Sequence, residues 1–192
     1  MDARVAECIG RLERFMQTVD DAMAVPREAG AFMHALIRAS GAQRAVEIGT
    51  SYGYSGLWIA SALAENGGRL LTIDRHARKT ASARTTFEAA GLVSVVELRT
   101  GEAVDVLPTL DGPIDFALND ADKENCRKYV ETLANKMSNR GVILTDNTIT
   151  HADQLAGFVA WVRGLEGFFS TRVPVGNGME MTVNLGLGGE DQ

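Results

Sequence analysis

The chain has 192 residues, of which 45 % are hydrophobic and 23 % are charged, as in ordinary globular proteins. This length can bury a substantial core without disulfides or structural metals, and we expect a single domain over residues 1–192. The formal net charge of -6 disfavours non-specific binding to nucleic acid, and no apolar stretch is long enough to span a membrane.

The cysteines and the first residues indicate a cellular compartment. Cys8 and Cys126 have a spacing that matches neither a metal knuckle nor a redox pair. We therefore expect reduced thiols in a cytoplasmic protein. Residues 1–7 carry no basic segment followed by an apolar core, so no signal peptide is predicted.

The predicted elements alternate between helices and strands along the chain. Apolar residues at helical spacing predict a helix over 3–19, within an N-terminal segment 1–25, and a second helix from Pro26 to Gly41. Strands are then predicted at 45–48, 70–73, 93–98, 114–118 and 141–145, and helices at 55–65, 77–90, 102–110, 123–138 and 152–164.

The last two apolar runs, 168–175 and 179–187, flank Gly176-Asn177-Gly178, which is a hairpin signal. Strands that alternate with helices favour a mostly parallel sheet with helices on both faces, and the terminal hairpin adds an antiparallel edge. The predicted fold is therefore α/β with seven strands. The tail 188–192 is expected to fray.

A glycine-rich turn follows the first predicted strand, within the segment Val46–Gly56. Glycines 49, 53 and 56 suit a tight turn or a ligand that touches the backbone, and the next helix points free amides at that place. A dinucleotide site would have Gly-x-Gly-x-x-Gly, but residues 51–56 lack its first glycine. The turn thus predicts a nucleoside-bearing cofactor and weakens the case for NAD. Asp74 ends the second strand, where an acid can accept the ribose hydroxyls of either cofactor.

Acidic and amide side chains follow the fourth and fifth predicted strands. Asp120 comes after one strand, and Asp146-Asn147 after the next. Because the carboxyl ends of parallel strands share one edge, these groups should converge beside the glycine turn. Two carboxylates and an amide oxygen suit Mg²⁺ or Ca²⁺ and do not suit a structural zinc. Asp122 is more simply explained as a cap of the helix expected near Lys123.

Four segments in this order resemble one family: Val46–Gly56, Asp120-Ala121-Asp122-Lys123, Thr145-Asp146-Asn147 and Val175–Gly178. They are similar to the cation-dependent O-methyltransferases, which include catechol and caffeoyl-coenzyme A O-methyltransferases and bacterial homologues. The resemblance covers about residues 26–186. It implies a Rossmann-like class I methyltransferase fold, S-adenosylmethionine as cofactor and a homodimer. It also implies a divalent cation, with Mg²⁺ expected first and Ca²⁺ or Mn²⁺ as alternatives.

The resemblance also implies roles for individual residues. Asp120, Asp146 and Asn147 would bind the metal, and Lys123 would act as the base beside the substrate hydroxyl, with Asp120 as a second catalytic residue. The expected cofactor contacts are Glu47, Gly49, Thr50, Ser51, Tyr54, Ser55, Asp74, Arg75, Gly101, Glu102, Ala103 and Asp120.

Three departures from the family pattern leave the methyl acceptor and the position methylated open. Asn119 stands where the family usually has an apolar residue. The region before Pro26 is short, and so is the stretch 148–152, where relatives often carry a longer loop over the substrate. His151 is most simply a surface residue, although it could line the substrate mouth.

The expected reaction is an in-line methyl transfer from a sulfonium to a hydroxyl, in which alignment supplies much of the rate enhancement. Two adjacent ring hydroxyls could chelate a cation, so a small catechol-like aromatic is the expected substrate. A tRNA methyltransferase acting on a hydroxylated wobble uridine is the alternative, against which the net charge of -6 counts modestly. A nicotinamide oxidoreductase and a non-catalytic cofactor-binding protein are weaker alternatives.

Overall fold

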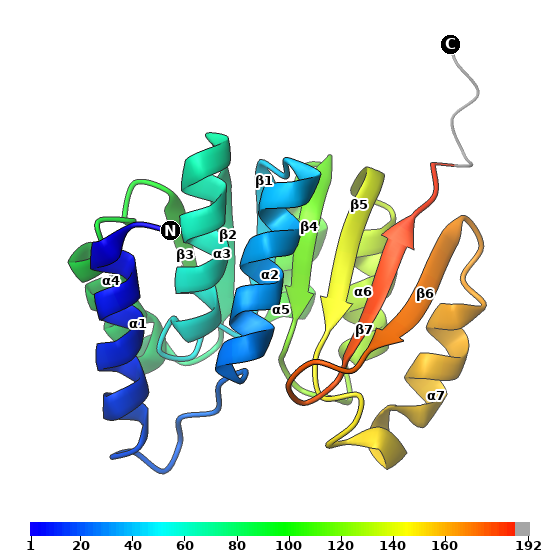
Figure 1. Ribbon diagram of the computed structural model, residues 1–192. Coiled ribbons are helices and arrows are strands. Elements are labelled where there is room, and N and C mark those ends of the chain that lie inside the picture. Colours follow the sequence, from blue (N-terminus) through cyan, green and yellow to red (C-terminus); the bar gives the residue numbers. More distant parts are fainter. Residues whose placement is uncertain (187–192) are drawn as a thin grey trace.

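Seven strands form one sheet in the computed structural model, which describes residues 1–186 (Figure 1). Their order is β3-β2-β1-β4-β5-β7-β6. Strands β1 to β5 run parallel, and β7 lies antiparallel between β5 and β6, which confirms the predicted sheet and its hairpin edge. The strands are β1 (Arg44–Ile48), β2 (Arg69–Asp74), β3 (Val96–Thr100), β4 (Ile114–Asn119), β5 (Met137–Thr145), β6 (Phe168–Val173) and β7 (Met179–Asn184).

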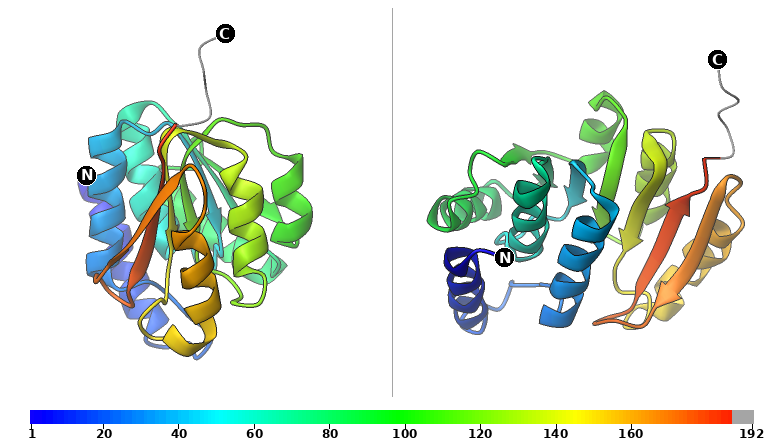
Figure 2. Two further views of the ribbon diagram at one scale, coloured as in Figure 1. Left: turned by 90° about the vertical axis from the view of Figure 1, so that its right-hand side faces the viewer. Right: turned by 45° about the horizontal axis from the view of Figure 1, so that its top comes forward.

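Helices cover both faces of the sheet and enclose two apolar cores (Figure 2). Neighbouring residues of β1 serve opposite cores, because side chains alternate along a strand: Ala45 packs on one face and Val46 on the other. The first face carries α1 (Ala3–Met16), α2 (Arg27–Ser40), α3 (Tyr54–Asn66) and α4 (Ala77–Ala90). The second carries α5 (Ala103–Val106), η1 (Leu107–Thr109), α6 (Cys126–Ala134) and α7 (Ala152–Arg163).

The register of the parallel strands brings their carboxyl ends to one edge, at the bottom of the sheet in Figure 1. Ile48 at the end of β1 is level with Ile73 on β2 and with Asn119 on β4. Asn119 is in turn level with Thr145 on β5. The segments that follow these four strands therefore start side by side.

The N-terminal helix is shorter than predicted. It ends at Met16, and residues 17–25 form an irregular segment that leads to α2. Asp20 and Asp21 explain the early end, because acidic side chains are unfavourable at the carboxyl end of a helix. Asp21 instead pairs with Arg78 of α4.

Two further predicted boundaries were wrong. The strand expected at 93–98 spans Val96–Thr100, because Leu92 and Val95 first close a turn in which the Val95 amide donates to the Leu92 carbonyl at 2.9 Å. The helix expected at 123–138 is reduced to Cys126–Ala134. Its last predicted turn belongs to β5 instead, where Met137 is buried and pairs with Ile114.

No helix within residues 1–186 has the length and apolar character needed to cross a bilayer. Cys8 and Cys126 are both buried free thiols. The predicted frayed tail, 188–192, lies outside the described residues.

Candidate active site

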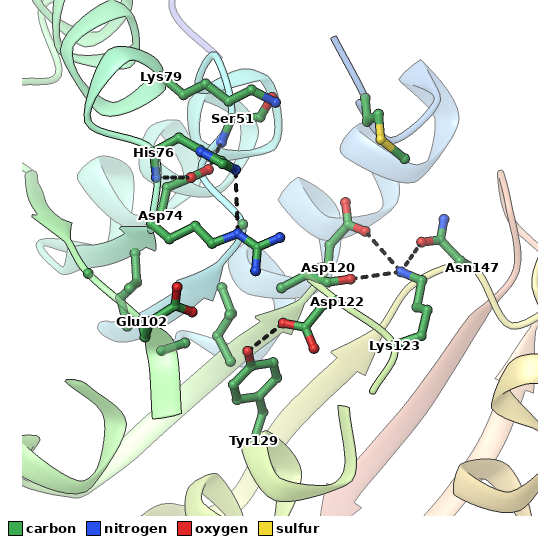
Figure 3. A pocket seen from close by; sticks show the side chains of 18 of the residues that line it. Ser51, Asp74, His76, Lys79, Glu102, Asp120, Asp122, Lys123, Tyr129 and Asn147 are labelled. Atoms are coloured by element: carbon green, nitrogen blue, oxygen red, sulfur yellow. Dashed lines mark hydrogen bonds and ion pairs between the residues drawn. The ribbon is translucent and has the colours of Figure 1, made fainter. Parts of the chain in front are cut away.

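A pocket of about 390 Å³ lies at the carboxyl edge of the parallel strands (Figure 3). This volume is in the range of small-molecule sites. The segments after β1, β2, β3, β4 and β5 all contribute to its wall. The predicted site residues that line it are Gly49, Ser51, Asp74, Arg75, Gly101, Glu102, Ala103, Asp120, Lys123 and Asn147.

The turn after β1 has a backbone that ordinary side chains rarely adopt. Gly49 has φ of 103°, and a Cβ placed there would lie 2.2 Å from the carbonyl oxygen of Asp120. Ser51 also has a positive φ, 46°, although it is not glycine. Strained backbone of this kind gathers at functional sites, where surrounding contacts hold it. The turn is therefore pressed directly against the start of the segment after β4.

Asp74 braces this turn and also faces the pocket. Its Oδ2 accepts a hydrogen bond from the Ser51 amide at 2.8 Å, and its Oδ1 accepts one from the His76 amide at 2.8 Å (Figure 3). A carboxylate has about four acceptor sites on its two oxygens, so capacity for two further hydroxyl donors remains. The side chain is thus rigidly oriented and chemically suited to a ribose diol.

Four of the predicted cofactor residues do not line the pocket. The Glu47 carboxylate is fully buried behind the turn, where it accepts hydrogen bonds from Ser55 Oγ and Thr72 Oγ1, both at 2.5 Å. Thr50 Oγ1 joins the same network through Thr72 at 2.6 Å. The Tyr54 hydroxyl donates to Glu13 at 2.6 Å. In this structure these side chains support the turn from behind.

The environment of Glu47 predicts a pH dependence of stability. Burial raises its pKa from 4.5 to about 7, against the hydrogen bonds from Ser55 and Thr72, and the charges of Asp120 and Asp74 raise it further. Because the folded-state pKa lies above the unfolded one, the folded protein binds more protons between these values. The contribution of Glu47 to stability is therefore fully present below pH 4.5 and is lost as the pH rises toward 7.

We expect Glu47→Gln to reduce the loss in free energy of unfolding between acid and neutral pH by up to about 3 kcal/mol, since the amide cannot ionise. Urea unfolding of the wild type and the variant at several pH values between acid and neutral measures the difference. Parallel curves for the two proteins would show that Glu47 does not titrate in this way.

Asp120 lines the other end of the pocket, whereas Asp146, predicted as a second metal ligand, lies outside its lining but close enough for its charge to act on Asp120. The Asp120 side chain is 20 % exposed, and Asp146 is almost fully buried. Burial raises the pKa of Asp120 to about 7, the charge of Asp146 raises it further, and Lys123 opposes both. The pKa of Asp146 is likewise raised, chiefly by burial. The folded protein therefore holds these two negative charges together at a cost.

Lys123 supplies positive charge among these oxygens. Its Nζ donates to Asn147 Oδ1 and to the Ala121 carbonyl at 3.0 Å, and lies 3.9 Å from Asp120 Oδ1 (Figure 3). Asn147 has φ of 71°, a left-handed conformation that asparagine tolerates better than most residues. Its Nδ2 donates to Asp146 Oδ2 at 3.0 Å. Asp120, Lys123, Asp146 and Asn147, predicted from separate segments, thus form one cluster.

The donor set of this cluster fits a hard divalent cation. Asp146 Oδ1 is buried and accepts no hydrogen bond from the described residues. Residues 1–186 bring no three His, Cys, Asp or Glu side chains together as a metal site. A cation bound here would therefore need the Asn147 amide oxygen beside the two carboxylates. Two carboxylates and one amide oxygen are ligands that Mg²⁺ and Ca²⁺ prefer.

The turn of the β6–β7 hairpin supports this cluster. The amides of Ile149 and Thr150 donate to the Asn177 carbonyl, at 3.0 and 3.3 Å. The Thr148 amide donates to the Gly178 carbonyl at 3.0 Å. The short segment after Asn147 is thereby fixed against the hairpin.

Several pocket residues were missed in the sequence. Met23, Lys79, Tyr129 and Gln154 line the wall, and so does His151, for which a surface position was the simpler prediction. Met23 comes from the irregular segment 17–25, which carries no motif. Only Tyr129 had a usable signal, because it lies near the start of the helix that was expected after Asp122.

Comparison with known protein families gives an independent result. A family model described as O-methyltransferase matches residues 2–157. The catechol O-methyltransferase of Niastella koreensis is 38 % identical over 133 residues, which are 67 % of this chain and 59 % of that protein. Caffeoyl-CoA O-methyltransferase 1 of Zea mays is 35 % identical over 133 residues, which are 66 % of this chain and 51 % of that protein.

Solved structures show the same fold. The O-methyltransferase TomG of Streptomyces achromogenes, involved in tomaymycin synthesis and solved with S-adenosylmethionine, superimposes with a TM-score of 0.81 at 28 % identity. The match covers 96 % of this chain and 90 % of that one. The chain thus spans between half and three-fifths of the curated relatives named above and most of this structural neighbour.

Proposed function

Because the chain belongs to the O-methyltransferase family, we propose that it transfers a methyl group from S-adenosylmethionine to a hydroxyl of a small aromatic substrate, assisted by a divalent cation. The observation that best supports this proposal is that a single pocket contains both the turn braced by Asp74 and the cluster of Asp120, Lys123 and Asn147. The names of the catechol and caffeoyl-CoA relatives support a hydroxylated aromatic acceptor.

The pocket offers separate places for cofactor and acceptor. The backbone of Gly49 and Ser51 lines the cavity, as do residues 101–103. Asp74 offers hydrogen-bond acceptors for a ribose. Lys123 and Asn147 lie apart from Asp74 in Figure 3, with Asp120 between them. We propose that the sulfonium lies near Asp120, so that its methyl group points toward the Lys123 end.

Lys123 is the proposed base for the acceptor hydroxyl. A phenolic hydroxyl has a pKa near ~10, so it must lose its proton to become a good nucleophile. To accept this proton Lys123 has to be a neutral amine, whose two N–H groups can still donate to Asn147 Oδ1 and the Ala121 carbonyl while its lone pair takes up the proton. A cation held by Asp120, Asp146 and Asn147 would act as a Lewis acid that makes a bound hydroxyl more acidic.

We expect S-adenosylmethionine to bind the protein and to raise its melting temperature, and methyl transfer to require Mg²⁺. Calorimetry measures the binding. Incubation with labelled cofactor and a panel of catechols, hydroxycinnamoyl thioesters and undermodified tRNA, with Mg²⁺ or EDTA, measures transfer and identifies the class of acceptor. Absence of cofactor binding would overturn the proposed function, and full activity in EDTA would overturn the role of the cation.

A further inference from the structure

The segment 120–125, called here the β4–α6 loop, carries both Asp120 and Lys123 but has no regular secondary structure. Its first amide, that of Asp120, donates to the Ile48 carbonyl at 3.0 Å. From 121 to 124, no backbone amide of the described chain donates to a backbone carbonyl. Side chains must therefore set the conformation of this part of the loop.

Asp122 and Tyr129 fasten the middle of the loop. Asp122 Oδ1 accepts hydrogen bonds from the backbone and side-chain nitrogens of Asn125, at 2.9 and 2.8 Å. Asp122 Oδ2 accepts one from the Tyr129 hydroxyl at 2.7 Å (Figure 3). Tyr129 belongs to α6, is 2 % exposed and packs in the core between this helix and the sheet, so it is a rigid anchor. Asp122 does not cap α6 itself, which begins only at Cys126.

Asn119 and Cys126 fasten the two ends of the loop to each other. The Asn119 Nδ2 donates to the Cys126 Sγ at 3.1 Å and approaches the Cys126 carbonyl at 3.4 Å. Asn119 is 2 % exposed, and a buried amide is normally hydrogen-bonded. The end of β4 is thereby tied to the first residue of α6. This gives Asn119, which departs from the family pattern, a specific structural partner.

We infer that Tyr129 and Asn119 are positioning residues, which hold the β4–α6 loop so that Asp120 and Lys123 face the reacting groups. This inference rests on the proposed methyl transfer. Neither side chain needs to touch the acceptor, because each acts through the loop. Small displacements of reacting groups are expensive in such a reaction, with about a hundredfold loss for roughly 1 Å.

The test compares Tyr129→Phe and Asn119→Ala with a matched control, Ser138→Ala. The Phe variant keeps the ring in the core and removes only the donor to Asp122. Ser138 also donates a hydroxyl hydrogen bond to a carboxylate, that of Asp115 at 2.8 Å, but it lies in the first part of β5, away from the pocket. Three quantities are measured on each protein: kcat, the Kd of S-adenosylmethionine, and hydrogen exchange of the Asp120 and Asn125 amides, which are hydrogen-bonded at the two ends of the loop.

We expect kcat to fall about tenfold in Tyr129→Phe, which loses a charge-assisted hydrogen bond to Asp122, and about tenfold in Asn119→Ala, which loses a neutral hydrogen bond to Cys126 together with a buried side chain. The Asp120 and Asn125 amides should exchange about tenfold faster in both variants. Ser138→Ala should change neither quantity. The effects on kcat should be less than multiplicative in the double variant, because both residues act on one loop.

Unchanged exchange in the loop would overturn the inference, as would faster exchange with unchanged kcat. A weaker cofactor Kd with unchanged kcat would show instead that Tyr129 is a cofactor contact. If the wild type bound no S-adenosylmethionine, the proposed function would fail, whereas the exchange measurement would still decide whether these residues hold the loop.

Discussion

Replacing Asp120 with asparagine is expected to remove methyl transfer while making the cation-free protein more stable. The two effects share one cause. Burial and the neighbouring charge of Asp146 both raise the pKa of Asp120, so its ionised form is unfavourable in the fold. An amide of the same shape relieves the repulsion, and we expect a gain of about 1 kcal/mol in the free energy of unfolding.

The loss of activity in Asp120→Asn follows from the same carboxylate. Asp120 is one of the proposed cation ligands, and it lies 3.9 Å from Nζ of Lys123. We expect kcat/KM to fall by about a hundredfold to a thousandfold, which is the size of effect seen when one preorganised electrostatic group is removed from an active site. Melting curves with Mg²⁺ and with EDTA should show stabilisation of the wild type by the cation, and none of the variant.

Asp115→Asn is the matched control, because it should change the free energy of unfolding in the opposite direction and leave activity unchanged. The Asp115 carboxylate accepts hydrogen bonds from the amides of Gln43 and Arg44, both at 2.9 Å, and these hold its pKa low although burial opposes them. Its loss should destabilise the fold and leave kcat unchanged. An Asp120→Asn variant that kept its activity, or that was destabilised like Asp115→Asn, would contradict the proposed role.

The sheet could be predicted because its signals are local. Most of the parallel strands contain a short apolar run that ends in a turn, and the alternation of strands with helices restricts the topology. The errors arose where tertiary contacts outweighed the local pattern. Met137 continues a helical pattern in the sequence, yet it pairs with Ile114 and becomes the start of β5. Strand β3 likewise starts later than predicted, because Leu92 and Val95 close a turn before it.

The candidate site was predictable where it depends on strand ends. Asp120 and Asp146 follow strands that are neighbours in the sheet, so the topology alone brings them together. The sequence could not show that Glu47 is buried behind the turn, because its partner Thr72 comes from another strand. Nor could it place Met23 in the pocket, since an irregular segment has no periodicity to interpret.

Gly49→Ala is expected to be among the most damaging single changes in the chain, since it combines two penalties. The residue has φ of 103°, which alanine adopts only with strain, and its Cβ would lie 2.2 Å from the carbonyl oxygen of Asp120. That oxygen is backbone, so it cannot move away without moving Asp120. We expect a loss of roughly 3–5 kcal/mol in the free energy of unfolding, measured by urea denaturation.

Gly67→Ala separates the strain from the clash. Gly67 has φ of 74°, but a Cβ there meets nothing within 4 Å, so only the conformational penalty of about 1 kcal/mol applies. It should leave cofactor binding unchanged. In Gly49→Ala, the cofactor Kd and the stabilisation by Mg²⁺ should both deteriorate, because one contact joins the cofactor turn to the acidic cluster. If the variant lost cofactor binding but kept full stabilisation by Mg²⁺, the two halves of the pocket would have to be independent, and the Gly49–Asp120 contact would not be what aligns them.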